Sequence, residues 1–150
     1  MSISLAGFSQ TEKGTLMIGG NGNIEFPDND IEFRLNPTVG KFVADKFCVG
    51  LSLPLIYIDS DLYMDITPLA RYYWGVKETR SFYVSGAIGL ASLFDMEHTV
   101  TNNEITLGLG HVWFLTKNVG FEVEMQGRLD SEDVNLGMNM GFQIYLNKQK

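Results

Sequence analysis

Eight charged residues fall on one phase of an alternating pattern of polar and apolar residues, so they would face the same side of a sheet. Charges that are taken out of water need partners, and arginine forms strong paired hydrogen bonds with carboxylates. The pattern therefore predicts a structural network of ion pairs, with a gated path for protons or ions as the alternative. The residues are Arg34, Arg71, Arg128, Glu25, Glu32, Asp65, Glu122 and Glu124.

A second set of carboxylates lies in short Asp-rich segments between the alternating stretches. Clustered carboxylate oxygens favour Ca²⁺ or Mg²⁺, but no segment has the spacing of an EF-hand loop. Two interpretations stay open, namely solvated loop residues or a weak, diffuse layer of bound cations. The set comprises Asp28, Asp30, Asp59, Asp61, Asp95, Glu97, Asp130, Glu132 and Asp133.

The two histidines and the single cysteine are the remaining candidates for catalysis or metal binding. His98 lies in an acidic segment, and His111 lies on the apolar phase close to Trp113. Neither histidine belongs to a His-x-Ser pairing that would indicate a nucleophilic mechanism. Cys48 has no second cysteine for a disulfide or a metal site, so we expect a small buried side chain. We therefore expect no catalytic residue, no metal ligand and no cofactor.

The composition limits the classes of protein to which the chain can belong. Its 150 residues suit one domain, and only 19% of them are charged, which is low for a soluble surface of this size. A net charge of -7 and a pI near 4.7 argue against nucleic acid as a partner. The sequence has no run of about 18 apolar residues, so only a closed barrel of strands could cross a bilayer.

Period-two alternation recurs in eight segments, and none has the spacing of an amphipathic helix. Each segment has about 11 to 14 residues, which at about 3.3 Å per residue and a tilt near 45° crosses the hydrocarbon layer. Pro37, Pro54 and Pro68 fall inside these segments, and we expect a bulge or local twist at Pro37 and Pro68 rather than a broken strand. We predict strands over Thr15–Phe26, Ile31–Phe42, Phe47–Ile58, Leu62–Trp74, Ser81–Phe94, Glu104–Leu115, Val119–Leu129 and Val134–Leu146.

The connections between the segments alternate between acidic stretches and short turns that contain lysine. Alternate connections of an up-and-down arrangement lie at the same end. The acidic set would therefore form one rim, here called the acidic rim, and the lysine-containing turns would form the lysine rim together with both termini. Aromatic residues are expected near both rims, among them Phe42, Tyr73, Trp74, Trp113 and Phe114 at the lysine rim.

The two phases of the alternation differ in a way that indicates which one faces outward. One phase is large, apolar and essentially uncharged at mid-strand, as in Met138, Met140 and Phe142. The other holds the charged residues, tyrosines and many glycines, as the narrow interior of an eight-stranded barrel requires. A soluble calyx that binds a hydrophobic ligand would reverse the faces, but its water-facing side need not be rich in glycine. The pattern favours an apolar phase that faces lipid.

These features resemble the small Gram-negative outer-membrane β-barrels of the OmpA/OmpX type, the outer-membrane-protein β-barrel domain. The similarity is carried by residues 35–53 (LNPTVGKFVADKFCVGLSL), 66–75 (ITPLARYYWG), 105–127 and the last strand. The resemblance implies an all-β fold, an eight-stranded antiparallel up-and-down transmembrane β-barrel in the bacterial outer membrane, with periplasmic termini. It also implies that Asn139, Gly141, Ile144 and Leu146 form the signal read by the barrel-assembly machinery, although Leu146 stands where the family usually has an aromatic residue.

Residues 1–10 are interpreted as the residual tail of a signal peptide or a disordered N-terminus, and residues 11–150 as a single barrel domain. We expect a monomeric, non-enzymatic outer-membrane protein with a packed polar interior and a structural or surface-interaction role, and not an open pore. Its partners would be outer-membrane lipid, the barrel-assembly machinery and lipopolysaccharide, whose phosphates a cation layer at the acidic rim would bridge. The alternatives are the soluble calyx and, third, a lipid A-modifying enzyme.

Overall fold

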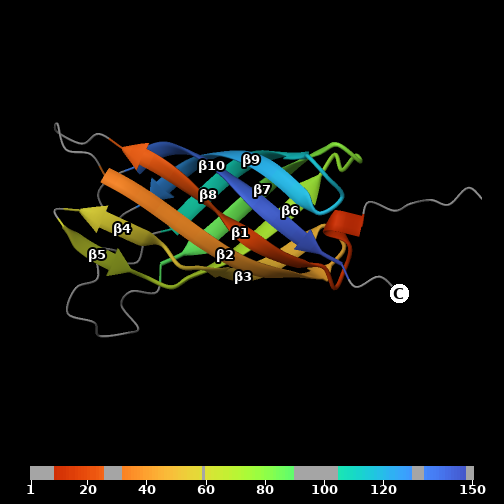
Figure 1. Ribbon diagram of the computed structural model, residues 1–150, viewed down its shortest axis with the longest axis horizontal. Coiled ribbons are helices and arrows are strands. Elements are labelled where there is room, and N and C mark those ends of the chain that lie inside the picture. Colours follow the sequence, from red (N-terminus) through yellow and green to blue (C-terminus); the bar gives the residue numbers. More distant parts are fainter. Residues whose placement is uncertain (1–8, 26–31, 59, 90–104, 130–133, 148–150) are drawn as a thin grey trace, which may run out of the picture.

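The computed structural model of the chain describes residues 9–25, 32–58, 60–89, 105–129 and 134–147, most of them in antiparallel strands (Figure 1). A 3₁₀ turn, η1, spans Ser9–Thr11. The strands are β1 (Leu16–Glu25), β2 (Glu32–Ala44), β3 (Phe47–Ser52), β4 (Leu55–Ile58), β5 (Asp61–Met64), β6 (Thr67–Trp74), β7 (Arg80–Ile88), β8 (Ile105–Phe114), β9 (Val119–Leu129) and β10 (Val134–Leu146).

The strands form one sheet that closes on itself. β1 pairs with β10 on one side and with β2 on the other, and the rest of the sheet follows the order of the chain. The short elements β3 and β4 are two parts of one interrupted strand, and so are β5 and β6. The pairings on either side of each interruption keep the same register. The predicted eight-stranded antiparallel up-and-down barrel is confirmed. The eight predicted segments match its eight strands, with β3 and β4 counted as one strand and β5 and β6 as another.

Pro37 and Pro68 are accommodated without a break in their strands. Pro37 stays in register with Gly20 of β1, and its carbonyl accepts a hydrogen bond from the Leu53 amide at 2.9 Å. Pro68 is paired with Leu51 of β3. Each proline lacks only its own N–H, so the register can pass through it.

The predicted bulge is not found at Pro37. The one register shift between β2 and β3 lies between Phe42 and Ala44, next to the turn at the lysine rim. Pro54 lies in the interruption between β3 and β4, where its carbonyl accepts a hydrogen bond from the Asp65 amide at 3.2 Å. The wall is therefore interrupted at Pro54 and Asp65, two neighbouring positions on adjacent strands.

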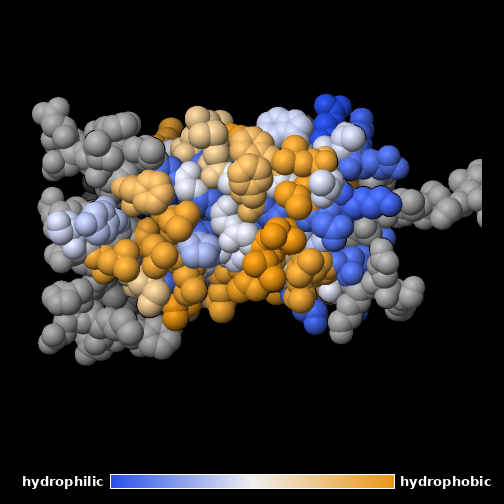
Figure 2. Space-filling model, in the orientation of Figure 1, coloured by the Kyte–Doolittle hydropathy of each residue, from blue (hydrophilic) through white to orange (hydrophobic). Residues whose placement is uncertain are grey.

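Side chains alternate between the inside and the outside of the barrel. Burial along β10 alternates without exception from Met138, which is exposed, to Leu146, which is also exposed. The exposed set is apolar at mid-strand, and Leu109 and Met125 expose 57% and 66% of their surfaces. On the face that Figure 2 shows, apolar side chains cover the middle of the barrel, and hydrophilic ones gather at the end that carries the lysine-containing turns. The apolar phase faces outward, which is the reverse of what a soluble calyx requires.

Aromatic residues at the lysine rim divide between the two faces. Phe42, Tyr73 and Phe114 were expected at a membrane interface, but they point into the barrel and are buried, because they fall on the inward phase of their strands. The outward aromatics instead contact one another from strand to strand, and Trp113 stacks on Phe121 with ring centroids 6.0 Å apart. An outward row thus runs through Trp74, Phe82, His111, Trp113, Phe121 and Phe142.

The segment before β1 packs against the lysine rim. Gln10 and Thr11 are buried, the Lys46 amide donates to the Thr11 carbonyl at 2.7 Å, and the Lys13 amide donates to Asp45 Oδ1 at 2.8 Å. The expected domain boundary between residues 10 and 11 falls inside this packed turn, and residues 1–8 lie outside the described part. In the described ranges, no helix is long and apolar enough to cross a membrane.

Candidate functional site

A buried ion pair joins opposite walls of the barrel. Arg71 of β6 donates to Glu122 of β9 through both terminal nitrogens, with Nη1 2.8 Å from Oε2 and Nη2 3.1 Å from Oε1. The side chains of Arg71 and Glu122 are only 3% and 1% exposed. Gln143 donates a further hydrogen bond to Glu122 Oε1 at 3.0 Å, and the Arg71 guanidinium lies 4.5 Å from the centroid of the Tyr83 ring. This planar two-point pairing is the strong form of an arginine–carboxylate contact.

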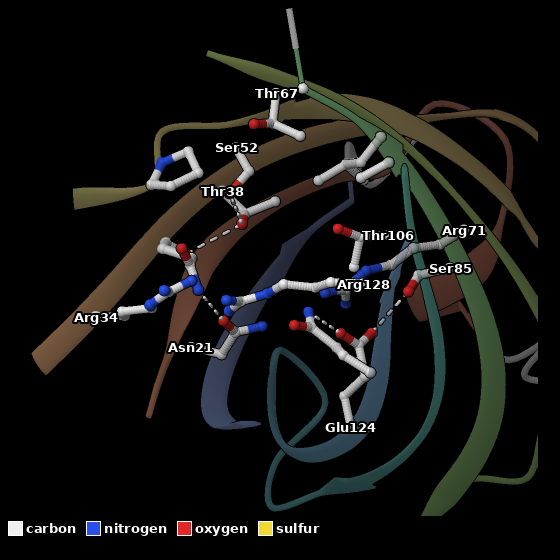
Figure 3. Close-up of a pocket in the computed structure, with 16 residues that line it drawn as sticks. Asn21, Arg34, Thr38, Ser52, Thr67, Arg71, Ser85, Thr106, Glu124 and Arg128 are labelled. Atoms are coloured by element: carbon white, nitrogen blue, oxygen red, sulfur yellow. Dashed lines mark hydrogen bonds between the residues drawn. The ribbon is translucent and has the colours of Figure 1, made fainter. Parts of the chain in front are cut away.

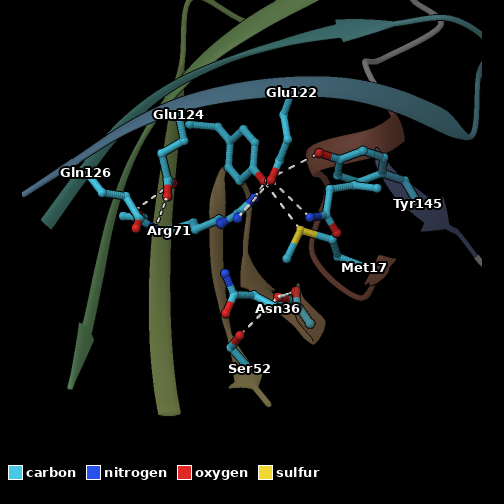
Figure 4. A network of polar contacts seen from close by, with 12 residues as sticks. Met17, Asn36, Ser52, Arg71, Glu122, Glu124, Gln126 and Tyr145 are labelled. Carbon is cyan, nitrogen blue, oxygen red and sulfur yellow. Dashed lines mark hydrogen bonds and ion pairs between the residues drawn. The ribbon is translucent and has the colours of Figure 1, made fainter. Parts of the chain in front are cut away.

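Three buried tyrosines lie between the ion pair and the lysine rim. Tyr73, Tyr83 and Tyr145 are fully or almost fully buried. The hydroxyl of Tyr73 lies 3.5 Å from that of Tyr145 and 3.4 Å from the sulfur of Met17 (Figure 4). The Tyr73 ring also packs against Phe42 and Tyr83, each with ring centroids 5.4 Å apart. Aromatic rings and the ion pair together occupy this half of the lumen, and we call this group the plug.

Beyond the plug, Glu124 forms a second polar cluster. Ser85 donates to Glu124 Oε2 at 2.8 Å, and Gln126 donates to Oε1 at 2.7 Å. On β2 and β1, the side-chain amide of Asn36 donates to Asn21 Oδ1 at 3.0 Å. These groups border a cavity of about 100 Å³, which we call the lumen cavity (Figure 3). Its lining also includes Arg34, Arg71 and Arg128 together with the hydroxyls of Thr38, Ser52, Thr67 and Thr106.

The structure brings part of the predicted charge network together. Arg71 pairs with Glu122, Glu124 lies on the same cavity, and Arg34 and Arg128 reach that cavity from β2 and β9. Asp65 accepts a hydrogen bond from the Ile66 amide at 2.7 Å at the wall interruption. Glu25 and Glu32 are paired through their backbones across β1 and β2, and their side chains lie outside the described part.

The other predicted residues are spread over the molecule. Asn139 and Gly141 are buried in the lumen, whereas Ile144 and Leu146 point outward on the same strand. Cys48 is buried and is not part of a disulfide. Of the acidic rim, the structure describes only the backbone of Asp61, at the start of β5. The remaining members, Asp28, Asp30, Asp59, Asp95, Glu97, Asp130, Glu132 and Asp133, lie outside the described residues.

The structure describes one of the two histidines, His111. His98 lies outside the described residues. His111 points outward between Phe82 and Trp113, with ring centroids 4.4 Å and 4.2 Å away. In the ranges that the structure covers, no three His, Cys, Asp or Glu side chains are close enough to hold a metal ion.

Tyr83 is the most central of the site residues that sequence reasoning missed. It lies under the Arg71 guanidinium and beside Tyr73, at the centre of the plug. The signal for it was present, since Tyr83 alternates with the outward Phe82 and Val84 and shares the inward phase with Ser81 and Ser85.

Gly110 makes room for Tyr83, and its replacement gives a first prediction. Gly110 is the cross-strand partner of Tyr83, and a Cβ atom at this position would overlap the tyrosine ring. Because Arg71 and Tyr73 hold that ring, Gly110→Ala is expected to lower the free energy of unfolding by about 1 to 3 kcal/mol. Urea unfolding of the refolded barrel in lipid vesicles, followed by tryptophan fluorescence, measures the change.

Gly127→Ala is the matched control for this prediction. Gly127 points outward, and an added Cβ would meet only the Leu136 side chain at an ordinary distance of 3.7 Å. We expect an unfolding midpoint close to that of the native chain. Equal stability of the two alanine variants would contradict the close packing of Tyr83 against Gly110.

Comparison with known proteins supports the fold. The N-terminal β-barrel domain of Pseudomonas aeruginosa OprF matches with a TM-score of 0.68 at 15% sequence identity, over 89% of this chain and 98% of that one. A de novo designed transmembrane β-barrel matches with a TM-score of 0.59 at 14% identity, over 90% of this chain and 98% of the designed one. No protein-family model and no curated protein matches the sequence. The chain therefore has the fold of an eight-stranded transmembrane β-barrel.

Proposed function

We propose that the protein is an integral outer-membrane β-barrel with a closed, packed interior and a structural or surface-interaction role. The observation that carries this proposal is the contrast between the two faces. The outward face is apolar through the middle of the strands, whereas the inward face contains the Arg71–Glu122 pair and the tyrosines of the plug. Only lipid would receive such an outward face favourably.

The plug supports a closed lumen rather than a pore. An eight-stranded barrel is just wide enough for its side chains to fill. Here the bidentate pair spans the lumen between β6 and β9, and three tyrosines occupy the space below it. The lumen cavity of about 100 Å³ lies on one side of this barrier. We infer that solutes do not pass through the barrel.

Location and partners follow from the same proposal. The protein lies in the bacterial outer membrane as a monomer, surrounded by lipid and lipopolysaccharide, with both termini on the periplasmic side. The outward Ile144 and Leu146 and the inward Asn139 and Gly141 of β10 would present the final strand to the barrel-assembly machinery. The acidic rim would face outward from the cell and bind cations weakly.

A catalytic role has less support. A lipid A-modifying enzyme would need a nucleophile or a base beside a histidine. His111 is flanked by Phe82 and Trp113, and its exposed neighbours offer no such group within the described ranges. We therefore propose no enzymatic activity.

Reconstitution into vesicles tests the proposal. The protein is refolded into phosphatidylcholine vesicles, and insertion is checked by a heat-dependent mobility shift in SDS gel electrophoresis. Vesicles are then placed in an isotonic solution of arabinose, and their swelling is followed by light scattering. We expect vesicles that contain the protein to swell at the same rate as protein-free vesicles, whatever the protein-to-lipid ratio. Swelling that rises with the amount of inserted barrel would refute the closed lumen, and a protein that stays soluble in plain buffer would refute the membrane location.

A further inference from the structure

Three prolines weaken one patch of the barrel wall. Pro37 lies in β2, Pro54 between β3 and β4, and Pro68 in β6. Three neighbouring strands of the barrel therefore each lack one backbone N–H donor. The interruptions at Pro54 and Asp65 fall within the same patch. The strands are interrupted in this patch, whereas the pairing of β8, β9 and β10 is continuous.

The pairing of β6 with β7 also ends in this patch. It runs from Trp74–Phe82 to Leu69–Ala87, although β6 begins two residues earlier at Thr67 and β7 continues to Ile88. The next residue of β6 is Pro68, which has no N–H to donate. Regions with few backbone hydrogen bonds open at the lowest free-energy cost. The β6–β7 edge at Leu69 and Ala87 is therefore where this wall opens most readily.

Leu69 and Ala87 separate two spaces of opposite character. On the inside they line the lumen cavity, beside the hydroxyls of Ser52, Thr67 and Ser85. On the outside the same two residues line a groove of about 680 Å³. The groove floor consists of small residues, and its sides are Leu51, Ile88, Ile105 and Leu107. One pair of residues is thus the partition between a polar cavity and an apolar groove.

The groove has the size and surface of an acyl-chain site. It crosses four strands, β3, β6, β7 and β8, which at about 4.8 Å per spacing gives a length of roughly 14 Å. Its flanking residues are exposed on the apolar outward face, so the groove is continuous with the membrane surface. A hydrocarbon chain can fill such a groove, and the cavity behind it offers hydroxyl, amide and guanidinium donors to an oxygen-rich head group.

We propose that the wall at Leu69 and Ala87 is a lateral portal that binds a single-chain amphiphile. The acyl chain lies in the outer groove, and the oxygen-rich head, a carboxylate in the simplest case, enters the lumen cavity. The plug closes the cavity on its other side, so the head is held rather than passed through the barrel. This inference rests on the proposed membrane location but not on the proposed structural role.

Photolabelling with two fatty-acid probes tests the portal. Both probes are derivatives of palmitic acid, one with a diazirine near the carboxylate and one with a diazirine at the far end of the chain. Each is added to phosphatidylcholine vesicles that contain the inserted barrel, and labelled residues are mapped by mass spectrometry. We expect the head probe to label Ser52, Thr67 or Ser85, and the tail probe to label Leu51, Ile105 or Leu107. An excess of unlabelled palmitic acid is expected to reduce both.

A substitution at Ala87 tests the portal most directly. Ala87 shares the inward phase of β7 with Ser85, so Ala87→Leu fills the cavity directly behind the partition, and we expect head-probe labelling of cavity residues to fall at least 5-fold. Val134→Leu enlarges a side chain on the lipid-facing side of β10, which β9 separates from the groove strand β8, and should leave labelling unchanged. If Ala87→Leu shows no heat-dependent mobility shift, Ala87→Val makes the same test with a smaller change.

The outcomes separate the portal from the membrane location. Failure of the native chain to insert would overturn both. Insertion with head-probe labelling confined to outward-facing residues would overturn the portal alone, as would cavity labelling that Ala87→Leu leaves unchanged.

Discussion

Replacement of Arg71 by methionine is expected to lower the free energy of unfolding by about 3 to 5 kcal/mol. The substitution would leave Glu122, which is only 1% exposed, with the single hydrogen bond from Gln143. An unpaired carboxylate in the lumen retains its desolvation cost but loses the ionic contact that offsets it. Tyr83 would also lose the guanidinium that lies over its ring. Urea unfolding in phosphatidylcholine vesicles, read by the fluorescence of the two tryptophans, measures the loss.

Two further variants identify the cause of that loss. Arg80→Met removes an exposed arginine at the lysine rim and should change stability by less than about 0.5 kcal/mol. Combining Arg71→Met with Glu122→Met removes both charges, so the double variant should be more stable than the sum of the single losses predicts. Additive losses, or a cost below about 1 kcal/mol for Arg71→Met, would show that the pair is not the structural centre of the plug.

The alternation of residue types was enough to predict the inward face but not the partners within it. Arg71 and Glu122 lie 51 positions apart and on opposite walls. The period-two alternation predicts only that both side chains point inward. Which arginine meets which carboxylate depends on the height of each strand after closure and on the side-chain rotamers that the narrow lumen permits. The same limit explains why Tyr83, an ordinary inward residue by pattern, proved central.

The wall of the barrel shows a second limit. Pro54 and Pro68 were visible in the sequence, but their consequence depends on register, which places them on adjacent strands beside the end of the β6–β7 pairing. Register also determines that Leu69 and Ala87 lie opposite each other and separate the cavity from the groove. Local propensity carries no information about such a juxtaposition, because it arises from residues far apart in the chain.

Leu109→Arg is expected to cost about 2 to 4 kcal/mol if the outward face is covered by lipid. Leu109 lies in the middle of β8, exposes 57% of its surface, and has the outward Val84 and Met125 as cross-strand partners. A charge at the bilayer midplane must be buried in hydrocarbon or draw water and head groups inward. In water the same substitution at such an exposed position would change stability by less than about 0.5 kcal/mol. The urea midpoint in phosphatidylcholine vesicles distinguishes the two environments.

Leu115→Arg is the matched control, because it places the same charge on the same chain segment at a different depth. Leu115 follows β8 at the lysine rim and is 61% exposed, which is close to the exposure of Leu109. Near the interface the cost of arginine falls to about 0 to 1 kcal/mol, since its long side chain reaches the head groups. Solvent exposure alone therefore predicts equal effects at the two positions, whereas a bilayer predicts a large effect only at Leu109. Equal, small changes would mean that water covers the apolar band, and the membrane location would have to be abandoned.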